Sequence, residues 1–374
     1  MREIYGGLET PFYVYDREKV EEKCNKLLNG FPFAKILYSV KANSNPEILK
    51  VVKGGGLDFE VVSLGELLSV SKCCSDLKDV VFNGNGKTYK EVKTALEMGV
   101  RFFNFDSVDQ LMLLEEVGKE TGINVLALAR IKPLVDVETH PSLRVGITTS
   151  KFGLLDEEID EVLSLEKSLK KVKIVGIHSH IGSNIKNAEP FIKSAKRAEK
   201  IAKLFPSVEI LNLGGGFSVD FEFKPLSEEY KKLTENYKIF IEPGRYIVAN
   251  AGFIVSRVVS IKRGYPYDFL VLDVGMSEII RPALYGAKHP IKALKSSELT
   301  KTYTVVGPIC ESLDVFGVYE LPIMRRGDMV VIEEAGAYGY SMASNYNGRP
   351  KPAEYMLENG GLRIIRPRQD YRVL

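Results

Sequence analysis

A lysine at position 41 ends the β-rich apolar run of residues 34–40 and stands directly before Ala42-Asn43. Such a run normally gives way to turn residues or a solvated charge, but here it carries a primary amine to the rim of the sheet that it joins. A lysine held at the carboxyl end of a strand can lose its proton and form a Schiff base with an aldehyde cofactor. A simpler interpretation, a lysine that only ends the strand, stays open at this point.

A glycine run, residues 214–216, is a second candidate because it follows the β-rich run 210–213. Its backbone N–H groups can converge on a phosphate, although a simple turn is an equally good interpretation. The other glycine run, residues 54–56, follows a helix-like segment, so we expect it to end that helix and to bind no ligand.

Two histidines, His178 and His180, alternate along one predicted strand and so share a face. A metal site would need a third ligand, and no nearby spacing offers one, so we expect no metal; one flat imidazole can instead stack on an aromatic cofactor. Glu242 precedes Pro243, whose ring makes a rigid exit from a strand. The Glu242 carboxylate can pair with a protonated pyridine nitrogen, or form a salt bridge with a neighbouring Arg or Lys.

These candidates all follow β-rich runs that alternate with charged, helix-like segments such as 45–53 and 88–98. The predicted strands are residues 36–40, 59–62, 80–82, 101–105, 125–130, 173–178, 208–213 and 238–242. Eight alternations over roughly 210 residues predict a parallel (β/α)8 barrel, with its active site at the carboxyl ends of the strands. Phosphates in such barrels favour the loops after strands seven and eight, where residues 214–216 and Gly244-Arg245 fall.

The alternation stops after Glu242, and short β-rich runs separated by Gly and Pro turns follow. These runs are residues 253–261, 268–273, 301–306, 329–333 and 362–366. They predict an antiparallel β domain, to which the early strand 12–15 is expected to pair. We therefore expect a barrel domain at residues 24–245 and a β domain made of residues 1–23 and 246–374.

Composition excludes several classes of partner. Lys+Arg 51 nearly balances Asp+Glu 49, so nucleic acid and anionic membranes are not expected partners. The N-terminus lacks an apolar signal region, and no run reaches transmembrane length. The four cysteines show no zinc spacing, which favours a reduced, cytoplasmic setting.

Together the motifs resemble those of the fold-type III pyridoxal-phosphate decarboxylases, a family with an alanine racemase-like fold of barrel and β domain. The resemblance extends over nearly the whole chain, and the ordered series is more specific than any one motif. The motifs are Tyr38-Ser-Val-Lys-Ala-Asn43, His140-Pro141, Ser150-Lys-Phe-Gly153, His180-Ile-Gly-Ser183, Gly214-Gly-Gly216, Glu242-Pro-Gly-Arg245, Ile280-Arg-Pro-Ala-Leu-Tyr285, Gly307-Pro-Ile-Cys-Glu-Ser312, Gly336-Ala-Tyr-Gly339 and Met342-Ala-Ser-Asn-Tyr-Asn347.

The resemblance implies that Lys41 carries pyridoxal 5′-phosphate through its amine and that His180 stacks on the pyridine ring. It assigns Glu242 to the ring nitrogen and Tyr338 to a cofactor contact from the β domain. The residues implied around the rest of the cofactor, chiefly its phosphate, are Ser183, Gly214, Gly215, Gly216, Pro243, Gly244 and Arg245.

The implied reaction is decarboxylation of meso-2,6-diaminopimelate to L-lysine and CO2, the last step of lysine biosynthesis. The far end of this substrate carries a carboxylate and an ammonium group, so its recognition needs cations and an anion. Arg245, Arg281 and Tyr285 are assigned to the carboxylate, Glu311 to the ammonium group, and Tyr338 to a further substrate contact. Domain packing is the alternative role for Arg281 and Tyr285.

Cys310 is the implied catalytic partner of Lys41, returning a proton to the carbon that has lost CO2. The resemblance places Cys310 and Glu311 in the active site of a second subunit, which implies a homodimer with shared active sites. A small buried hydrophobe is the alternative role for Cys310.

The sequence departs from the family pattern at a few positions. Leu313 follows Cys-Glu-Ser where Gly is usual, Glu60 stands where Asp is expected, Asn184 replaces a common Gln, and Arg130-Ile-Lys-Pro133 replaces Arg-Val-Asn-Pro. Leu313 matters most, because it lies in the predicted substrate loop. Alternative functions are a related decarboxylase of carboxynorspermidine or other basic amino acids, or a non-catalytic pyridoxal-phosphate-binding protein; a racemase is less favoured.

Overall fold

The computed structural model describes residues 2–136 and 150–373, so the motif His140-Pro141 lies outside the described residues. The chain forms two compact units. Unit 2 is Glu21–Tyr246, and unit 1 combines Met1–Val20 with Ile247–Leu374.

Within the described residues of unit 2, eight parallel strands close into a barrel, as the sequence predicts. They are β2 (Ala34–Ser39), β3 (Asp58–Val61), β4 (Val81–Phe82), β5 (Phe102–Phe105), β6 (Val125–Ile131), β7 (Val172–Ser179), β8 (Ile210–Asn212) and β9 (Lys238–Ile241). Strand β2 pairs with both β3 and β9, which closes the ring. Leu37, Leu128 and Phe240, from three of these strands, belong to one buried apolar cluster.

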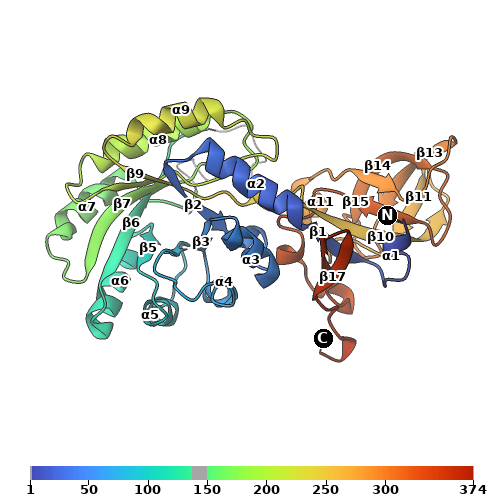
Figure 1. Ribbon diagram of the computed structural model, residues 1–374, viewed down its shortest axis with the longest axis horizontal. Helices are drawn as coiled ribbons and strands as arrows, with labels where there is room; N and C mark the ends of the chain where they lie inside the picture. Colours follow the sequence, from blue (N-terminus) through green and yellow to red (C-terminus); the bar gives the residue numbers. More distant parts are fainter. Residues whose placement is uncertain (1, 137–149, 374) are drawn as a thin grey trace. The chain divides into compact units, whose positions relative to one another are not determined.

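Helices α3 to α9 lie around the outside of these strands (Figure 1). They are α3 (Pro46–Gly54), α4 (Leu64–Val70), α5 (Tyr89–Glu97), α6 (Val108–Thr121), α7 (Asp156–Glu166), α8 (Glu189–Ala202) and α9 (Lys224–Leu233), with α2 (Arg17–Gly30) before them and the short α10 (Arg245–Val248) after β9.

Local sequence sets several of the helix ends. Helix α5 begins with a capping box between Thr88 and Glu91, and α3 is capped by the Asn45 side chain. The run 54–56 ends α3, as predicted, with Gly55 as its C-cap.

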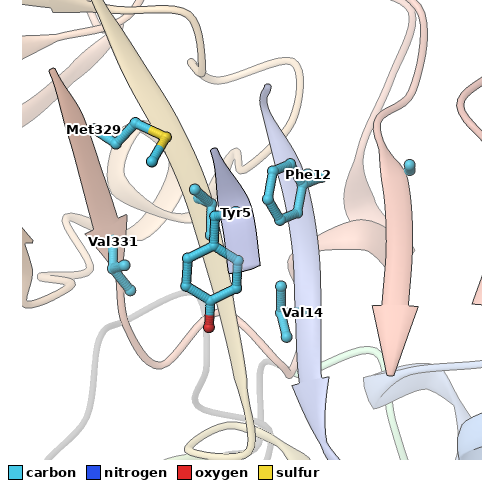
Figure 2. Packing of buried hydrophobic residues seen from close by; sticks show 7 residues of the cluster. Tyr5, Phe12, Val14, Met329 and Val331 are labelled. Atoms are coloured by element: carbon cyan, nitrogen blue, oxygen red, sulfur yellow. The ribbon is translucent and has the colours of Figure 1, made fainter. Parts of the chain in front are cut away.

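Unit 1 is built on a nine-stranded sheet within the described residues. Its strands are β1 (Phe12–Asp16), β10 (Gly252–Lys262), β11 (Asp268–Leu272), β12 (Ile291–Ala293), β13 (Thr300–Val306), β14 (Val315–Pro322), β15 (Met329–Ile332), β16 (Ala353–Glu358) and β17 (Gly361–Arg366), and its short helices are α1 (Arg2–Tyr5) and α11 (Arg281–Tyr285). The early strand β1 pairs with β10 and β16, which confirms that it belongs to this sheet. Figure 2 shows the cluster that β1 helps to form, in which Phe12 and Val14 pack near Tyr5, Met329 and Val331.

The predicted antiparallel β domain is confirmed as a largely antiparallel sheet. Two of its strand pairs are parallel, β1 with β16 and β11 with β13. Strand β1 comes from the amino-terminal end of the chain and fills the position between β10 and β16. In the described parts of the chain, no helix combines the length and the apolar character that crossing a membrane requires.

Candidate active site

The Lys41 amine lies at the carboxyl end of the barrel, as the sequence predicts. Strand β2 ends at Ser39 and one turn of 3-10 helix, Val40–Ala42, follows it. Lys41 Nζ lies 2.6 Å from Glu60 Oε2, and the Glu60 side chain is fully buried. The register of β2 and β3 places Ser39 opposite Glu60, which brings the carboxylate within reach of the lysine two residues later.

A cavity of about 450 Å³ opens at this point. Its lining residues are Lys41, Glu60, Val62, Asn83, Gly84, Asn85, Gly86, Arg130, Phe152, His178, His180 and Glu242. The Arg130 guanidinium lies 4.5 Å from the centre of the Phe152 ring, so one wall combines a buried cation with an aromatic face. Glu60 Oε1 is buried and has no hydrogen-bond partner within the described residues, which leaves an acceptor for a bound molecule.

Glu242 lies just after β9 and is held from two neighbouring strands. Asn212 Nδ2 donates to Glu242 Oε1 at 2.7 Å, and His178 Nε2 lies 3.2 Å from Oε2. Burial alone would raise the pKa of Glu242, but the facing His178 and the charge of Lys41 outweigh burial and hold the pKa well below its usual value. Glu242 is therefore an oriented anion at neutral pH.

His180 follows β7 and accepts a hydrogen bond at Nδ1 from the Gly215 N–H, at 3.2 Å. Burial, together with the charges of Arg130 and Lys41, lowers the pKa of His180 well below its usual value. The ring is therefore a neutral imidazole that carries its proton on Nε2. The expected sharing of a face by His178 and His180 holds, since both line the cavity.

The loops after β7 and β8 are joined by backbone hydrogen bonds. Ile185 N–H donates to the Gly216 carbonyl at 2.9 Å, which brings Ser183 and the glycine run together. Arg245, at the start of α10, donates from Nη2 to Ser183 Oγ at 3.2 Å. The cluster therefore combines a hydroxyl, a guanidinium and a glycine backbone, which is a donor set suited to a phosphate.

The glycine run can be built only from glycine. A Cβ on Gly215 would lie 1.9 Å from the Glu242 carbonyl oxygen, and one on Gly216 would lie 2.3 Å from the Gly182 carbonyl oxygen. Gly216 also has a φ of +112°, in the region that side chains rarely adopt. The backbone of this run is therefore packed directly against the ends of two neighbouring strands.

The other predicted residues lie in unit 1. Arg281 and Tyr285 stand on α11, and Tyr338 has a left-handed φ of 58° in the loop after β15. Cys310 and Glu311 are exposed on the loop between β13 and β14. Cys310 N–H donates to Asn347 Oδ1 at 3.1 Å.

Asp314 stabilises the loop that contains Cys310 through several hydrogen bonds to backbone N–H groups. Its carboxylate accepts from the backbone N–H of Met276 at 2.6 Å and of Ile309 at 2.8 Å, and its own carbonyl accepts from Gly307 N–H. Leu313, the departure from the family pattern, is 60% exposed beside this anchor. The substitution is therefore accommodated on the surface of the unit.

Sequence reasoning identified the residues at the strand ends but missed most of their partners. Glu60 was noted only as a departure, whereas the structure shows it bound to Lys41. Asn212 and Asn104 were missed; Asn104 Nδ2 lies 2.9 Å from His178 Nδ1 and so orients that ring. A signal existed for Asn212, because an amide inside an apolar β-run that precedes a glycine run is unusual for a buried strand.

No group of three or more metal-ligating side chains occurs among the residues that the structure describes. The side chains at this end of the barrel suit an organic ligand, because Lys41 offers an amine for a carbonyl, His180 a neutral imidazole, and the glycine run 214–216 a cradle for an anion.

The closed parallel barrel, the mixed β unit and the lysine at the barrel mouth define a fold-type III decarboxylase. Residues 17–249 match the family described as pyridoxal-dependent decarboxylase, pyridoxal binding domain, and the chain belongs to this family.

Several similar proteins within this family are named diaminopimelate decarboxylase. The chain is 36% identical to the diaminopimelate decarboxylase of Archaeoglobus fulgidus, with 99% of this chain and 93% of the relative covered. It is similar to the crystal structure of the Helicobacter pylori diaminopimelate decarboxylase complexed with L-lysine, with a TM-score of 0.94, 34% identity and coverage of 100% and 97% of the two chains. The M. jannaschii diaminopimelate decarboxylase in co-complex with L-lysine gives a TM-score of 0.91 at 32% identity, with coverage of 99% and 92%.

Proposed function

We propose that this chain is an enzyme that decarboxylates meso-2,6-diaminopimelate to L-lysine and CO2 with pyridoxal 5′-phosphate, the last step of lysine biosynthesis. The single observation that carries the proposal is the Lys41 amine, held 2.6 Å from a fully buried Glu60 in a cavity that His180 and Glu242 also line. The assignment of the substrate is supported by relatives that are named diaminopimelate decarboxylase and that align with 99% of this chain.

The residues present fit this cofactor. An amine is available for its aldehyde, Glu242 is an oriented anion for the ring nitrogen, and the cradle at 214–216 would be filled by any Cβ. Ser183 and Arg245 lie together beside that cradle, within reach of one anion. These residues would hold the phosphate, with Pro243 and Gly244 shaping the exit of β9.

Bound pyridoxal phosphate supplies an electron sink for the pair of electrons that remains when the substrate carboxylate leaves. Glu60 accepts a hydrogen bond from Lys41 Nζ and can hold the lysine proton whenever the amine is free. Glu242 remains ionised because His178 and Lys41 stabilise its charge. As an anion it would favour the protonated form of the pyridine nitrogen of a bound cofactor. His180 stays neutral and presents a flat ring without adding a positive charge.

Substrate recognition is assigned to unit 1. Arg281 and Tyr285, with Arg245 from the barrel, bind the distal carboxylate, and Glu311 binds the distal ammonium group. Cys310 returns a proton to the carbon that loses CO2, and Tyr338 contacts cofactor and substrate. The exposure of Cys310 and Glu311 on their own unit supports the proposal that they serve a second subunit, in a homodimer with shared active sites.

The domain boundaries and the location complete the proposal. Residues 24–245 form the cofactor-binding domain, and residues 1–23 with 246–374 form the β domain. All four cysteines are free, which supports a reduced, cytoplasmic setting.

The test is a substrate panel. The purified protein, reconstituted with pyridoxal phosphate, is offered meso-diaminopimelate, L-lysine and L-ornithine, and CO2 release is measured. We expect turnover of meso-diaminopimelate alone, with L-lysine as the product. Preference for another basic amino acid would reject the proposed substrate, and cofactor absorbance without CO2 release from any of the three would reject the enzyme.

A further inference from the structure

His289 is a buried histidine outside the barrel site, and its side chain contacts the predicted substrate residue Arg281. It lies just before β12 and is 2% exposed. Its Nδ1 lies 2.9 Å from the Glu333 carbonyl oxygen, and its Nε2 lies 3.3 Å from Arg281 Nη1. The Tyr319 hydroxyl donates to the His289 carbonyl at 2.8 Å and fixes the backbone of the same residue.

These contacts determine the protonation state of the ring. A carbonyl oxygen only accepts, so the Nδ1 that faces Glu333 carries the proton. An arginine nitrogen only donates, so the Nε2 that faces Arg281 must be the unprotonated acceptor. An imidazolium would place an N–H and a positive charge against the guanidinium, which the Arg281 contact opposes.

The same arginine nitrogen has a second acceptor, the backbone carbonyl of a residue in a strained conformation. Arg281 Nη1 also donates to the Glu334 carbonyl oxygen at 3.4 Å. Glu334 has a φ of 58°, a conformation that a non-glycine residue adopts only when its surroundings hold it there. Residues 333 and 334 therefore present their two carbonyl groups to the histidine and to the arginine.

We propose that His289 is a positioning residue for Arg281: the neutral imidazole, locked as its Nδ1–H tautomer, aims the guanidinium at the distal carboxylate of the substrate. A carboxylate in this place would orient the arginine and add a negative charge beside it, whereas a neutral imidazole acceptor orients the arginine without adding a charge. This inference rests on the proposed function, because it concerns how that substrate is selected.

The binding test uses two amines that differ only in the distal carboxylate. L-lysine keeps that carboxylate and cadaverine lacks it, so their dissociation constants for the holoenzyme separate carboxylate recognition from general damage. In His289→Phe we expect the dissociation constant of L-lysine to rise about tenfold or more, and that of cadaverine to change less than about twofold. The KM of meso-diaminopimelate should rise in parallel, with a smaller change in kcat.

Two further variants sharpen the test. His289→Gln keeps an acceptor near the Nε2 position and should recover most of the L-lysine affinity that the phenylalanine variant loses. Lys292→Met is the matched control, because Lys292 pairs with the Glu333 side chain at 2.8 Å on the surface. This control should bind both amines as the wild type does. Equal losses for L-lysine and cadaverine, or no loss for L-lysine, would overturn the proposal.

Nitrogen NMR of the imidazole tests the contact without catalysis. The chain has four histidines, so the His289 signals can be assigned by comparison with His289→Gln. We expect a protonated Nδ1 and an unprotonated Nε2 that shifts in Arg281→Met; a proton on Nε2 would overturn the proposal. If the wild type failed to turn over meso-diaminopimelate, the proposed function would fall, and this measurement would still decide the contact.

Discussion

Two buried carboxylates at the barrel mouth, Glu60 and Glu242, have different partners and therefore different roles. Glu60 lies 2.6 Å from the Lys41 amine, whereas Glu242 is held by Asn212 and faces His178. A carboxylate without such partners would be costly to bury as an anion. The partners therefore fix which carboxylate serves the amine and which is left to serve a second group of a bound ligand.

Replacement of Lys41 tests the first of these roles. In Lys41→Ala we expect the visible absorbance of lysine-bound pyridoxal phosphate to disappear and kcat to fall by about a thousandfold or more, because Lys41 is the one lysine among the described residues that line the cavity. The control is Lys35→Ala, at the amino end of the same strand, where Lys35 pairs with Asp58 and Asp79. The Schiff-base assignment is wrong if the absorbance persists in Lys41→Ala.

Glu66 gives a pH dependence whose sign follows from its pKa. Burial and the nearby charge of Glu60 raise the pKa of Glu66 from 4.5 to about 7. The folded state therefore holds a proton that the unfolded chain releases above pH 4.5, and the stability that depends on this proton is lost as pH rises through 7. Glu66→Gln mimics the protonated side chain and can still accept from Val62 N–H.

We expect Glu66→Gln to match the wild type near pH 4.5 and to be more stable above pH 7, by about 3 kcal/mol at most in the free energy of unfolding. Urea unfolding of both proteins across this range measures the difference. Parallel curves at all pH values would show that Glu66 ionises normally in the folded state.

At the scale of elements, a backbone hydrogen bond from Ile185 N–H to the Gly216 carbonyl joins the loops after β7 and β8. Gly215→Ala would force its Cβ to within 1.9 Å of the Glu242 carbonyl, so the strand ends must move apart. We expect a loss of about 1–3 kcal/mol in the free energy of unfolding and a weaker affinity for pyridoxal phosphate by about tenfold or more. Equilibrium dialysis with the cofactor and urea unfolding measure these effects.

The other glycine run supplies the control for this variant. Gly54→Ala meets no atom within 4 Å and lies in the last turn of helix α3, so it should leave cofactor affinity unchanged and raise the free energy of unfolding by about 1 kcal/mol at most. Equal effects of the two substitutions would contradict the assignment of residues 214–216 to the phosphate.

The loop between β13 and β14 depends on Asp314. In Asp314→Ala the backbone N–H groups of Met276 and Ile309 lose their acceptor, at a cost of about 1–3 kcal/mol for each one that stays buried. We expect faster hydrogen exchange in residues 307–314 and a lower kcat, with an unchanged cofactor absorbance. Leu313→Ala, at a position that is 60% exposed, is the control and should leave the exchange unchanged.

At the scale of the whole molecule, the sequence predicted the elements that depend on local patterns and missed contacts between distant residues. All eight barrel strands were predicted to within a few residues, because each is a short apolar run bounded by turn residues or charges. Strands β12, β14 and β16 were missed. In β16 the buried Glu354 depends on the Tyr15 hydroxyl, which is distant in sequence, and on Arg366 of the neighbouring strand β17. The Lys41–Glu60 pair was missed for the same reason, because it depends on the register of two strands.

The proposed homodimer gives a prediction for the whole molecule. If Lys41 and Cys310 of different subunits meet in one active site, Lys41→Ala and Cys310→Ala are each inactive alone, yet a mixed dimer holds one complete site of two. Random reassortment makes about half of the dimers mixed, so the mixture should regain about a quarter of wild-type activity. Lys41→Ala mixed with the Lys41→Ala, Cys310→Ala double variant is the control and should regain none. Mixed dimers that form, as sedimentation of differently tagged subunits can show, but stay inactive would place both residues in the site of the same subunit.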